Sequence, residues 1–208
     1  MSMDVFMSFI TQVTKGNLRR QGLPVPEEDE APEHRPNTPH VRFNGEDLWE
    51  VLTNNKAANH YKARGFFINL AINHAVLMER GAEDDGMSIP TYSASSPDEE
   101  ALVYAASHFG FVFEERVLRE VTLRMPEGIL ETYEILYNFE FTSARKRSSV
   151  VCQHPDGKTL LLLTKGADME IYRRLEETPG VAAEKERAQE LINLYCDEGL
   201  RTLVIAQR

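Results

Sequence analysis

The chain has 208 residues, 42% of them hydrophobic and 27% charged, and its formal net charge at pH 7 is −10. This length and composition predict a buried core and a single domain over residues 1–208. The acidic balance argues against the broad basic surface that long nucleic acid requires, so we expect no nucleic-acid partner. The longest apolar region, Phe66 to Met78, is shorter than the roughly 18 residues that span a bilayer, so we expect no direct membrane insertion.

Cysteine and histidine usage indicates neither a disulfide framework nor a metal site. Cys152 and Cys196 are far apart and form no C-x-x-C pair, so we expect two reduced, packed thiols in a cytosolic setting. The six histidines lack the spacing of metal ligands. We therefore assign no metal-binding residue.

The N-terminal region combines a strand-like run with a polar segment. Val5 to Val13 alternates imperfectly between apolar and polar residues, as a strand does. Residues 21–44 contain five prolines, an acidic run at 27–30 and almost no aliphatic side chains. Such a segment cannot bury enough apolar surface to order itself, so we expect a disordered or mobile insertion at 21–44.

Three helices are expected before the middle of the chain. Asp47 to Thr53 predicts a short helix, and the spacing of apolar residues predicts a longer one from Tyr61 to Glu79. Ser96-Pro-Asp-Glu99 has the form of a capping box, with proline in the first turn. This third helix should run to about His108.

The second half of the chain predicts an antiparallel sheet. Its runs of β-branched and aromatic residues are joined by turns that are too short for parallel crossovers. The expected strands are Phe111 to Arg116, Glu120 to Met125, Leu130 to Tyr137, Ser149 to His154 and Thr159 to Thr164.

The C-terminal region completes an α+β prediction. Helices are expected at Asp168 to Leu175 and Ala182 to Glu198, and a last strand at Thr202 to Ala206. The whole should be a twisted, mainly antiparallel sheet of about six or seven strands flanked by helices. The chain stops two residues after the last strand, which suggests a piece excised from a larger protein.

A cationic island stands out between Glu140 and Arg174, where seven Lys or Arg residues accompany four acids. It contains Phe141, a run of cations at 145–147, and Lys165 followed directly by glycine. An aromatic ring can stack on a base, and an ammonium group beside a glycine can meet a ligand's negative charge close to the backbone. The island therefore favours an adenine ring and a polyphosphate as ligand.

Each of these residues also has a purely structural interpretation. Phe141 is compatible with core packing, the 145–147 run with a solvated turn, and Glu99 with helix capping alone. Glu99 could instead accept a hydrogen bond from an exocyclic amine. Arg201, at the start of an apolar strand, could hold a phosphate in a bidentate manner or form a surface salt bridge.

Five motifs occur together and in one order along the chain. They are Ser96-Pro-Asp-Glu-Glu-Ala-Leu-Val103, Gly110-Phe-Val-Phe113, Phe141-x-Ser-x-Arg-Lys-Arg147, Lys165-Gly-Ala-Asp168 and Gly199-Leu-Arg-Thr-Leu203. Their order resembles the nucleotide-binding domain of P-type ATPases. The Ser-Pro-Asp-Glu and Lys-Gly-Ala-Asp forms are similar to the lipid-flippase (type IV) class. The resemblance covers roughly residue 66 to the C-terminus.

This resemblance implies a nucleotide site made of Glu99, Phe141, Ser143, Lys146, Lys165, Arg201 and Thr202. Within it, Phe141 would stack on adenine, and Glu99 and Ser143 would line the base pocket. Lys165 would lie beside the nucleotide.

The resemblance also assigns the residues on the phosphate side. Lys146, Arg201 and Thr202 would face the ribose or the phosphates. One departure affects the base pocket, because Ser148 stands where flippases usually carry methionine. An apolar contact beneath the base would be weakened.

The resemblance implies that this fragment binds ATP but does not hydrolyse it. No Asp-Lys-Thr-Gly occurs in the chain, so the aspartate that such pumps phosphorylate, and any catalytic residue, would lie outside it. Mg²⁺ would likewise be bound by the parent enzyme through residues outside the chain. The fragment would position ATP so that its γ-phosphate reaches an aspartate in a neighbouring domain.

Partners and location follow from the same resemblance. The parent would be a phospholipid-translocating ATPase, and this chain a cytoplasmic domain of that integral membrane protein. Expected partners are ATP or ADP and the phosphorylation and actuator domains, with an accessory subunit as a further candidate.

Two other hypotheses stay open. One is a regulatory or protein-interaction module that docks through the acidic segment 27–33 and has lost nucleotide binding through changes such as Ser148. The other is a free-standing phosphotransferase, which would lack an identifiable base, metal site or P-loop. Nucleotide titration separates the first from an ATP-binding domain, and turnover of ATP by the pure chain would favour the second.

Overall fold

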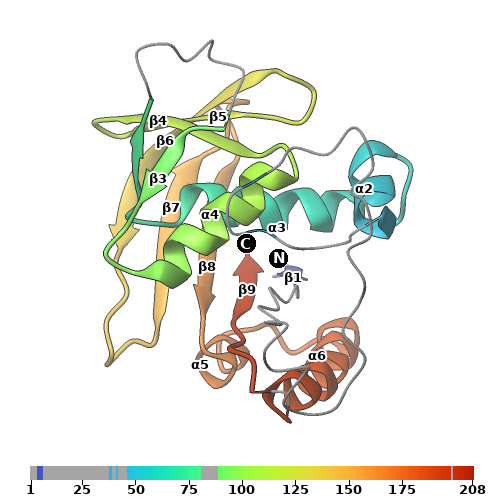
Figure 1. The fold of residues 1–208 in the computed structure, drawn as a ribbon. Coiled ribbons are helices and arrows are strands. Elements are labelled where there is room, and N and C mark those ends of the chain that lie inside the picture. Colours follow the sequence, from blue (N-terminus) through green and yellow to red (C-terminus); the bar gives the residue numbers. More distant parts are fainter. Residues whose placement is uncertain (1–3, 7–37, 39–40, 42–45, 81–88, 198) are drawn as a thin grey trace, which may run out of the picture.

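The computed structural model describes residues 4–6, 38, 41, 46–80, 89–197 and 199–208, and Figure 1 shows their arrangement. The helices are α2 (Glu46–Thr53), α3 (His60–Ile72), α4 (Pro97–His108), α5 (Asp168–Tyr172) and α6 (Pro179–Asp197). The strands are β1 (Asp4–Phe6), β2 (Leu77–Glu79), β3 (Thr91–Ser93), β4 (Val112–Val117), β5 (Glu120–Arg124), β6 (Leu130–Phe139), β7 (Arg147–Gln153), β8 (Leu160–Gly166) and β9 (Val204–Gln207).

Seven strands form one sheet in the order β1-β9-β8-β7-β6-β5-β4, and neighbouring strands in it pair in antiparallel fashion. Strands β4 to β8 follow one another in sequence order because short turns join each to the next. The predicted α+β class with a mainly antiparallel sheet is therefore confirmed. Strands β2 and β3 pair as a separate two-stranded sheet, which the sequence pattern did not predict.

Different helices cover the two faces of the large sheet (Figure 1). On one face, Leu163 and Ile205 belong to a core built with α3 and α4. On the other, Val204 and Ala206 pack with Ile171 of α5 and with α6. Neighbouring residues of β9 thus alternate between two cores, as the period of a strand requires. We call these sides the α3 face and the α5 face.

Two buried asparagines attach α3 to the sheet. Asn69 Nδ2 donates to the carbonyl oxygens of Thr164 and Ala206, both at 3.3 Å. Asn73 Nδ2 donates to the carbonyl oxygen of Leu163 at 3.4 Å. A buried amide without such partners would be costly, so these bonds fix the position of α3 over β8 and β9.

The predicted helix from Tyr61 to Glu79 is wrong beyond Ile72, where α3 ends. His74 forms the turn that follows. Its Nε2 lies 2.9 Å from the carbonyl oxygen of Ala71, and the backbone N–H of Val76 donates to its Nδ1 at 3.1 Å. The imidazole ring forms hydrogen bonds with nearby backbone groups in place of another helical turn. The apolar run then continues as β2.

The N-terminal predictions fall mostly on residues outside the described part of the chain. Of the predicted strand Val5 to Val13, only the segment within β1 is described, and 7–13 lie outside. The predicted insertion at 21–44 also lies outside, except for Thr38 and Val41. Thr38 is buried, and its Oγ1 lies 3.0 Å from Nδ1 of His108, so the chain contacts α4 at this point.

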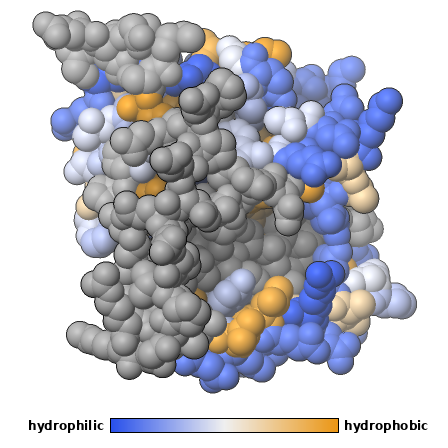
Figure 2. Space-filling view, turned by 45° about the vertical axis from the view of Figure 1, so that its right-hand side comes forward, coloured by the Kyte–Doolittle hydropathy of each residue, from blue (hydrophilic) through white to orange (hydrophobic). Residues whose placement is uncertain are grey.

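The surface in view in Figure 2 is mainly hydrophilic where residues are described, with small separate hydrophobic patches. The large apolar side chains that are exposed include Leu118 in the turn between β4 and β5. No helix within 46–80 or 89–197 is long and apolar enough to cross a membrane.

The two cysteines have opposite environments. Cys152 of β7 is completely buried, and burial raises its pKa to about 12. Cys196 of α6 is exposed. The expectation of two packed thiols is therefore wrong for Cys196, because the side of α6 that carries it faces solvent.

Candidate functional site

Lys165 and Glu99 form a largely buried ion pair on the α3 face. Lys165 Nζ lies 3.3 Å from Glu99 Oε1, and the two side chains are 7% and 23% exposed. Burial lowers the pKa of Lys165, and the negative charge of Glu99 opposes that shift. A buried ammonium group needs such a counter-charge. The structure therefore brings together two of the residues predicted for the site.

Gly166 fixes the backbone beside Lys165. A Cβ atom at this position would lie 2.5 Å from the carbonyl oxygen of Lys146 and 2.7 Å from Cα of Arg147. Both of these are backbone atoms, and moving them aside would cost free energy because the strand pairing would be disturbed. The N–H of Ala167 also donates to the carbonyl oxygen of Lys146 at 3.0 Å. The end of β8 is thus in close contact with the start of β7, and only glycine fits between them.

The capping box predicted at the start of α4 does not form. Ser96 is the N-cap with an extended backbone and Pro97 is in the first turn, as predicted, but Ser96 makes no side-chain capping hydrogen bond. Glu99 Oε2 instead accepts a hydrogen bond from the backbone nitrogen of Ala75 at 3.3 Å. The carboxylate of Glu99 therefore joins the loop after α3 to Lys165.

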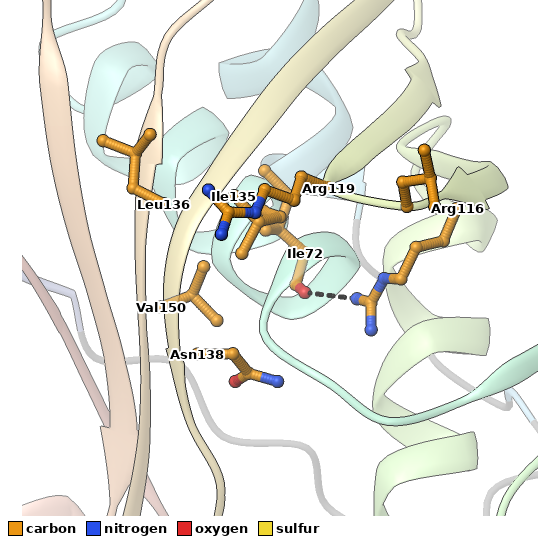
Figure 3. Close-up of a pocket in the computed structure, with 8 residues that line it drawn as sticks. Ile72, Arg116, Arg119, Ile135, Leu136, Asn138 and Val150 are labelled. Atoms are coloured by element: carbon orange, nitrogen blue, oxygen red, sulfur yellow. Dashed lines mark hydrogen bonds between the residues drawn. The ribbon is translucent and has the colours of Figure 1, made fainter.

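Arg116, whose charge interacts with that of Glu99, lines an open cavity of about 330 Å³ (Figure 3). Arg116 Nη2 donates to the carbonyl oxygen of Ile72 at 3.1 Å. Burial lowers the pKa of Arg116, and the nearby charge of Glu99 opposes this. The cavity lining combines apolar and polar side chains: Ile72, Arg116, Leu118, Arg119, Ile135, Leu136, Asn138 and Val150.

Arg116 and Asn138 are candidates that the sequence pattern did not single out. Arg116 ends a predicted strand, where a charged side chain is usually solvated. Asn138 stands between exposed Tyr137 and Phe139, pairs with Val150 on β7, and lines the cavity. Asn138 is itself exposed, as Tyr137 and Phe139 are, so no local signal in the sequence singled it out.

His74 completes the polar cluster as a neutral side chain. Burial lowers its pKa well below 6.5, and the positive charges of Arg116 and Lys165 lower it further. Its contacts agree with this state, since Nδ1 accepts a hydrogen bond from the N–H of Val76 while Nε2 faces the carbonyl oxygen of Ala71. Both positive groups can therefore stand next to an uncharged ring.

Phe141, Ser143 and Lys146 lie on the turn between β6 and β7, and all three are exposed. The N–H of Lys146 donates to the carbonyl oxygen of Thr142 at 2.7 Å, and Lys146 has a left-handed φ of 51°. The Phe141 ring is 61% exposed, which excludes the alternative that it packs in the core. Neither Phe141 nor Lys165 is among the residues that line the cavity beside Arg116.

Arg201 and Thr202 precede β9, with Arg201 exposed and Thr202 half-buried. Arg201 Nη1 lies 2.6 Å from Oδ2 of Asp98, next to Glu99 in α4. The structure thus places Arg201 beside the same helix start as the buried pair. Among the described residues, no group of three or more His, Cys, Asp or Glu side chains could hold a metal ion.

Ser148 lies within this site. It is buried on β7 and pairs with Lys165 across the sheet. Its carbonyl oxygen is 3.5 Å from Nδ2 of Asn73. A small hydroxyl side chain therefore stands beside the enclosed ammonium group, at a position where the motif comparison leads one to expect a longer apolar side chain.

Comparison with known proteins gives a family match over most of the chain. The family model described as "P-type ATPase, cytoplasmic domain N" matches residues 66–208. This range contains both faces of the sheet, the buried ion pair and the exposed turn after β6. It begins within α3 and leaves out the N-terminal segment and α2.

Curated relatives carry the names of phospholipid-transporting ATPases. Phospholipid-transporting ATPase 10 of Arabidopsis thaliana is 43% identical over 148 residues, which are 69% of this chain and 12% of that protein. Phospholipid-transporting ATPase IC of Xenopus tropicalis is 37% identical over 170 residues, 82% of this chain and 13% of that protein. Phospholipid-transporting ATPase VB of Homo sapiens is 41% identical over 126 residues, which are 56% of this chain and 9% of that protein. The chain spans roughly a tenth of these relatives.

Proposed function

This chain belongs to the P-type ATPase cytoplasmic domain N family, and from that premise we propose that it binds ATP for a phospholipid-translocating pump. The observation that carries the proposal is the enclosed ammonium group of Lys165, which has the carboxylate of Glu99 as its counter-charge on the α3 face. Burying this charge costs free energy that a purely structural role would not require. A role in binding an anionic ligand explains why the charge is there.

The exposed turn after β6 supplies the partner for the base. Phe141 offers an uncovered aromatic face, and stacking of a base on such a ring contributes about 1–3 kcal/mol. Glu99 would accept a hydrogen bond from the amine of adenine, with Ser143 nearby on the turn. The carboxylate already has two partners, so it is held in place before the nucleotide arrives.

The phosphates would lie toward the positive side chains around this turn and the start of β9. Lys146 and Arg201 are exposed, so each can turn its charged group toward a phosphate, and Thr202 adds a hydroxyl group. The ammonium group of Lys165 is buried, so it would act on the nucleotide through its positive charge and by holding Glu99 in place. Mg²⁺ would be held by the phosphates and by residues of the parent pump outside this chain.

The contribution of this domain to catalysis would be positioning. It would present the γ-phosphate to an aspartate of a neighbouring domain by hinge closure. The chain by itself would bind ATP without hydrolysing it. In the parent pump its partners would be the phosphorylation and actuator domains, with an accessory subunit as a further candidate, and the transported substrate would be a phospholipid, as the names of the relatives indicate.

The test is an NMR titration of the chain with ATP and with ADP. We expect saturable shifts around residues 141 and 165 and a dissociation constant on the order of 0.1–1 mM. Phe141→Ala should weaken binding about tenfold or more, because it removes the stacking surface. Tyr137→Ala is the matched control, since Tyr137 is an aromatic residue of β6 with 65% exposure, and it should leave the affinity unchanged.

Two results would overturn the proposal. Spectra that stay unaltered at 10-fold the expected dissociation constant would favour a regulatory or protein-interaction module that has lost nucleotide binding. Equal losses of affinity in Phe141→Ala and Tyr137→Ala would place the base elsewhere on the sheet.

A further inference from the structure

The sheet carries a second cavity on its α5 face, an open groove of about 270 Å³. Four of the nine side chains that line it are arginines and none is acidic, in a chain whose net charge is −10. We call it the arginine groove. It is lined by Phe139, Arg145, Arg147, Ser149, Leu162, Thr164, Ile171, Arg174 and Arg208.

Strand alternation separates the arginine groove from the proposed nucleotide site. Ser149 pairs with Thr164 and both line the groove, whereas the adjacent Ser148 pairs with Lys165. Successive side chains of a strand point to opposite faces. The groove therefore lies on the other side of the sheet from Lys165, and nothing in it depends on the proposed function.

Among the residues that the structure describes, the positive charge of the arginine groove is only partly balanced by carboxylates. Glu170 is the carboxylate that contacts these arginines, with distances of 3.8 Å to Arg147 and 3.0 Å to Arg174, and it also lies 3.3 Å from Arg173. Burial lowers the pKa of Arg147, and the neighbouring charges of Arg174 and Arg145 lower it further. One carboxylate shared by three guanidinium groups leaves an excess of positive charge, which a bound anion would offset.

The rest of the lining is apolar or carries hydroxyl groups. Phe139, Leu162 and Ile171 supply hydrocarbon surface, and Arg145 Cζ lies 5.5 Å from the centroid of the Phe139 ring. Arg145 Nη1 already donates to the carbonyl oxygens of Phe139 and Glu140, at 2.9 and 2.7 Å, so these bonds hold the guanidinium group against the ring. Cationic and apolar surfaces therefore meet within a single hollow.

We propose that the arginine groove binds a phosphate monoester with an apolar or aromatic substituent. Guanidinium groups match the geometry of phosphate oxygens and bind them in pairs. A phosphate monoester carries about −1.5 to −2 charges at pH 7, more than a carboxylate does, and so offsets more of the excess charge. The hydroxyl groups of Ser149 and Thr164, 3.0 Å apart, offer further polar contacts. A groove of about 270 Å³ fits a small ligand rather than a polymer.

The experiment is an NMR titration with phenyl phosphate, inorganic phosphate and benzoate at constant ionic strength. We expect phenyl phosphate to shift signals of β7, β8 and α5 in a saturable way and to bind about five- to tenfold more tightly than inorganic phosphate, because its ring contacts the apolar wall. Benzoate should bind more weakly than phenyl phosphate because it carries one charge. Equal affinities for phenyl phosphate and inorganic phosphate would overturn the assignment of an apolar substituent.

Charge-neutral variants locate the ligand. Arg147→Gln and Arg174→Gln should each weaken phenyl phosphate binding about tenfold. Arg187→Gln is the matched control, since Arg187 is an exposed arginine of α6 that does not line the groove, and it should have no effect. If all three variants change the affinity equally, or if no shift occurs with the folded wild-type chain, the proposal is wrong.

A further variant keeps this test separate from the nucleotide site. Phe141→Ala should leave phenyl phosphate binding unchanged, because Phe141 does not line the groove. Loss of phenyl phosphate binding in Phe141→Ala would show that the ligand occupies the proposed ATP site and would overturn the arginine groove. Loss of ATP binding alone would count only against the proposed function.

Discussion

On the α3 face, Lys165 is almost completely enclosed and has the carboxylate of Glu99 at 3.3 Å. On the α5 face, Arg147 and Arg174 share Glu170 along an open groove. These cations are close together in sequence, yet the sheet separates them into one paired, enclosed ammonium group and a set of guanidinium groups that share one carboxylate. Charged residues that cluster in a sequence therefore need not belong to one site. Strand alternation decides on which face of the sheet each side chain lies, and burial decides how much its charge affects stability.

The largest effect should come from removing the counter-charge on the buried side. We expect Glu99→Gln to lower the free energy of unfolding by about 3 kcal/mol, because Lys165 would remain buried without a partner. Urea denaturation at pH 7 measures this. The double variant Glu99→Gln with Lys165→Met should recover much of the loss. A loss below about 1 kcal/mol for Glu99→Gln would mean that the two faces do not differ in the way described.

A smaller effect is expected at Gly166, where the end of β8 contacts the start of β7. Gly166→Ala should lower the free energy of unfolding by about 2 kcal/mol, because the added methyl group meets backbone atoms of β7 and the turn before it. Gly180→Ala in α6 is the control, since a Cβ there meets nothing within 4 Å. The same denaturation experiment should show little or no loss for Gly180→Ala, and equal losses would contradict the close contact at Gly166.

The buried side chain of His74 should make the stability of the chain depend on pH. His74 is neutral in the folded chain because its pKa lies well below 6.5, while the unfolded chain takes up a proton there below about pH 6.5. The free energy of unfolding should therefore fall as the pH drops below about 6.5, by at most about 1.4 kcal/mol per pH unit from this group. His74→Gln should reduce this slope, and urea denaturation at several pH values between about 5 and 7 measures it; an unchanged slope would contradict the role of His74.

The smallest effect is expected at the exposed pair next to the buried one. Asp98 and Arg201 have side chains that are 53% and 81% exposed, so Asp98→Asn should change the free energy of unfolding by less than about 1 kcal/mol. It should also free Arg201 and strengthen ATP binding slightly at low salt. A calorimetric titration checks the second effect, and weaker binding would show that Asp98 itself supports the nucleotide.

Much of the fold could be predicted because local signals agree with it. The strands from β4 to β8 have alternating side chains and short connecting turns, and this is enough to give an antiparallel sheet in sequence order. The end of α3 could not be predicted in the same way. The apolar run continues through Val76 to Met78, and only the tertiary burial of His74 shows that the helix stops at Ile72.

Individual residues of the candidate site could be predicted from the sequence, but the contacts between them could not. Lys165 was identified by the adjacent glycine, and the structure explains that glycine by its contact with β7. The partner of Lys165 was not predictable, because Glu99 had a local explanation as a capping residue. Arg116 was not singled out because a charged residue at a strand end is common, and its contacts with Ile72 and Glu99 join segments that are far apart in the sequence.

The contrast between the two cysteines has a practical consequence. Only the thiolate reacts with alkylating reagents, and Cys152 is both inaccessible and held in the thiol form. Cys196 on the surface of α6 is therefore a natural attachment point for a single fluorophore or spin label. A probe coupled there in the native sequence could report movements of α6 relative to a second label without engineering away the other cysteine.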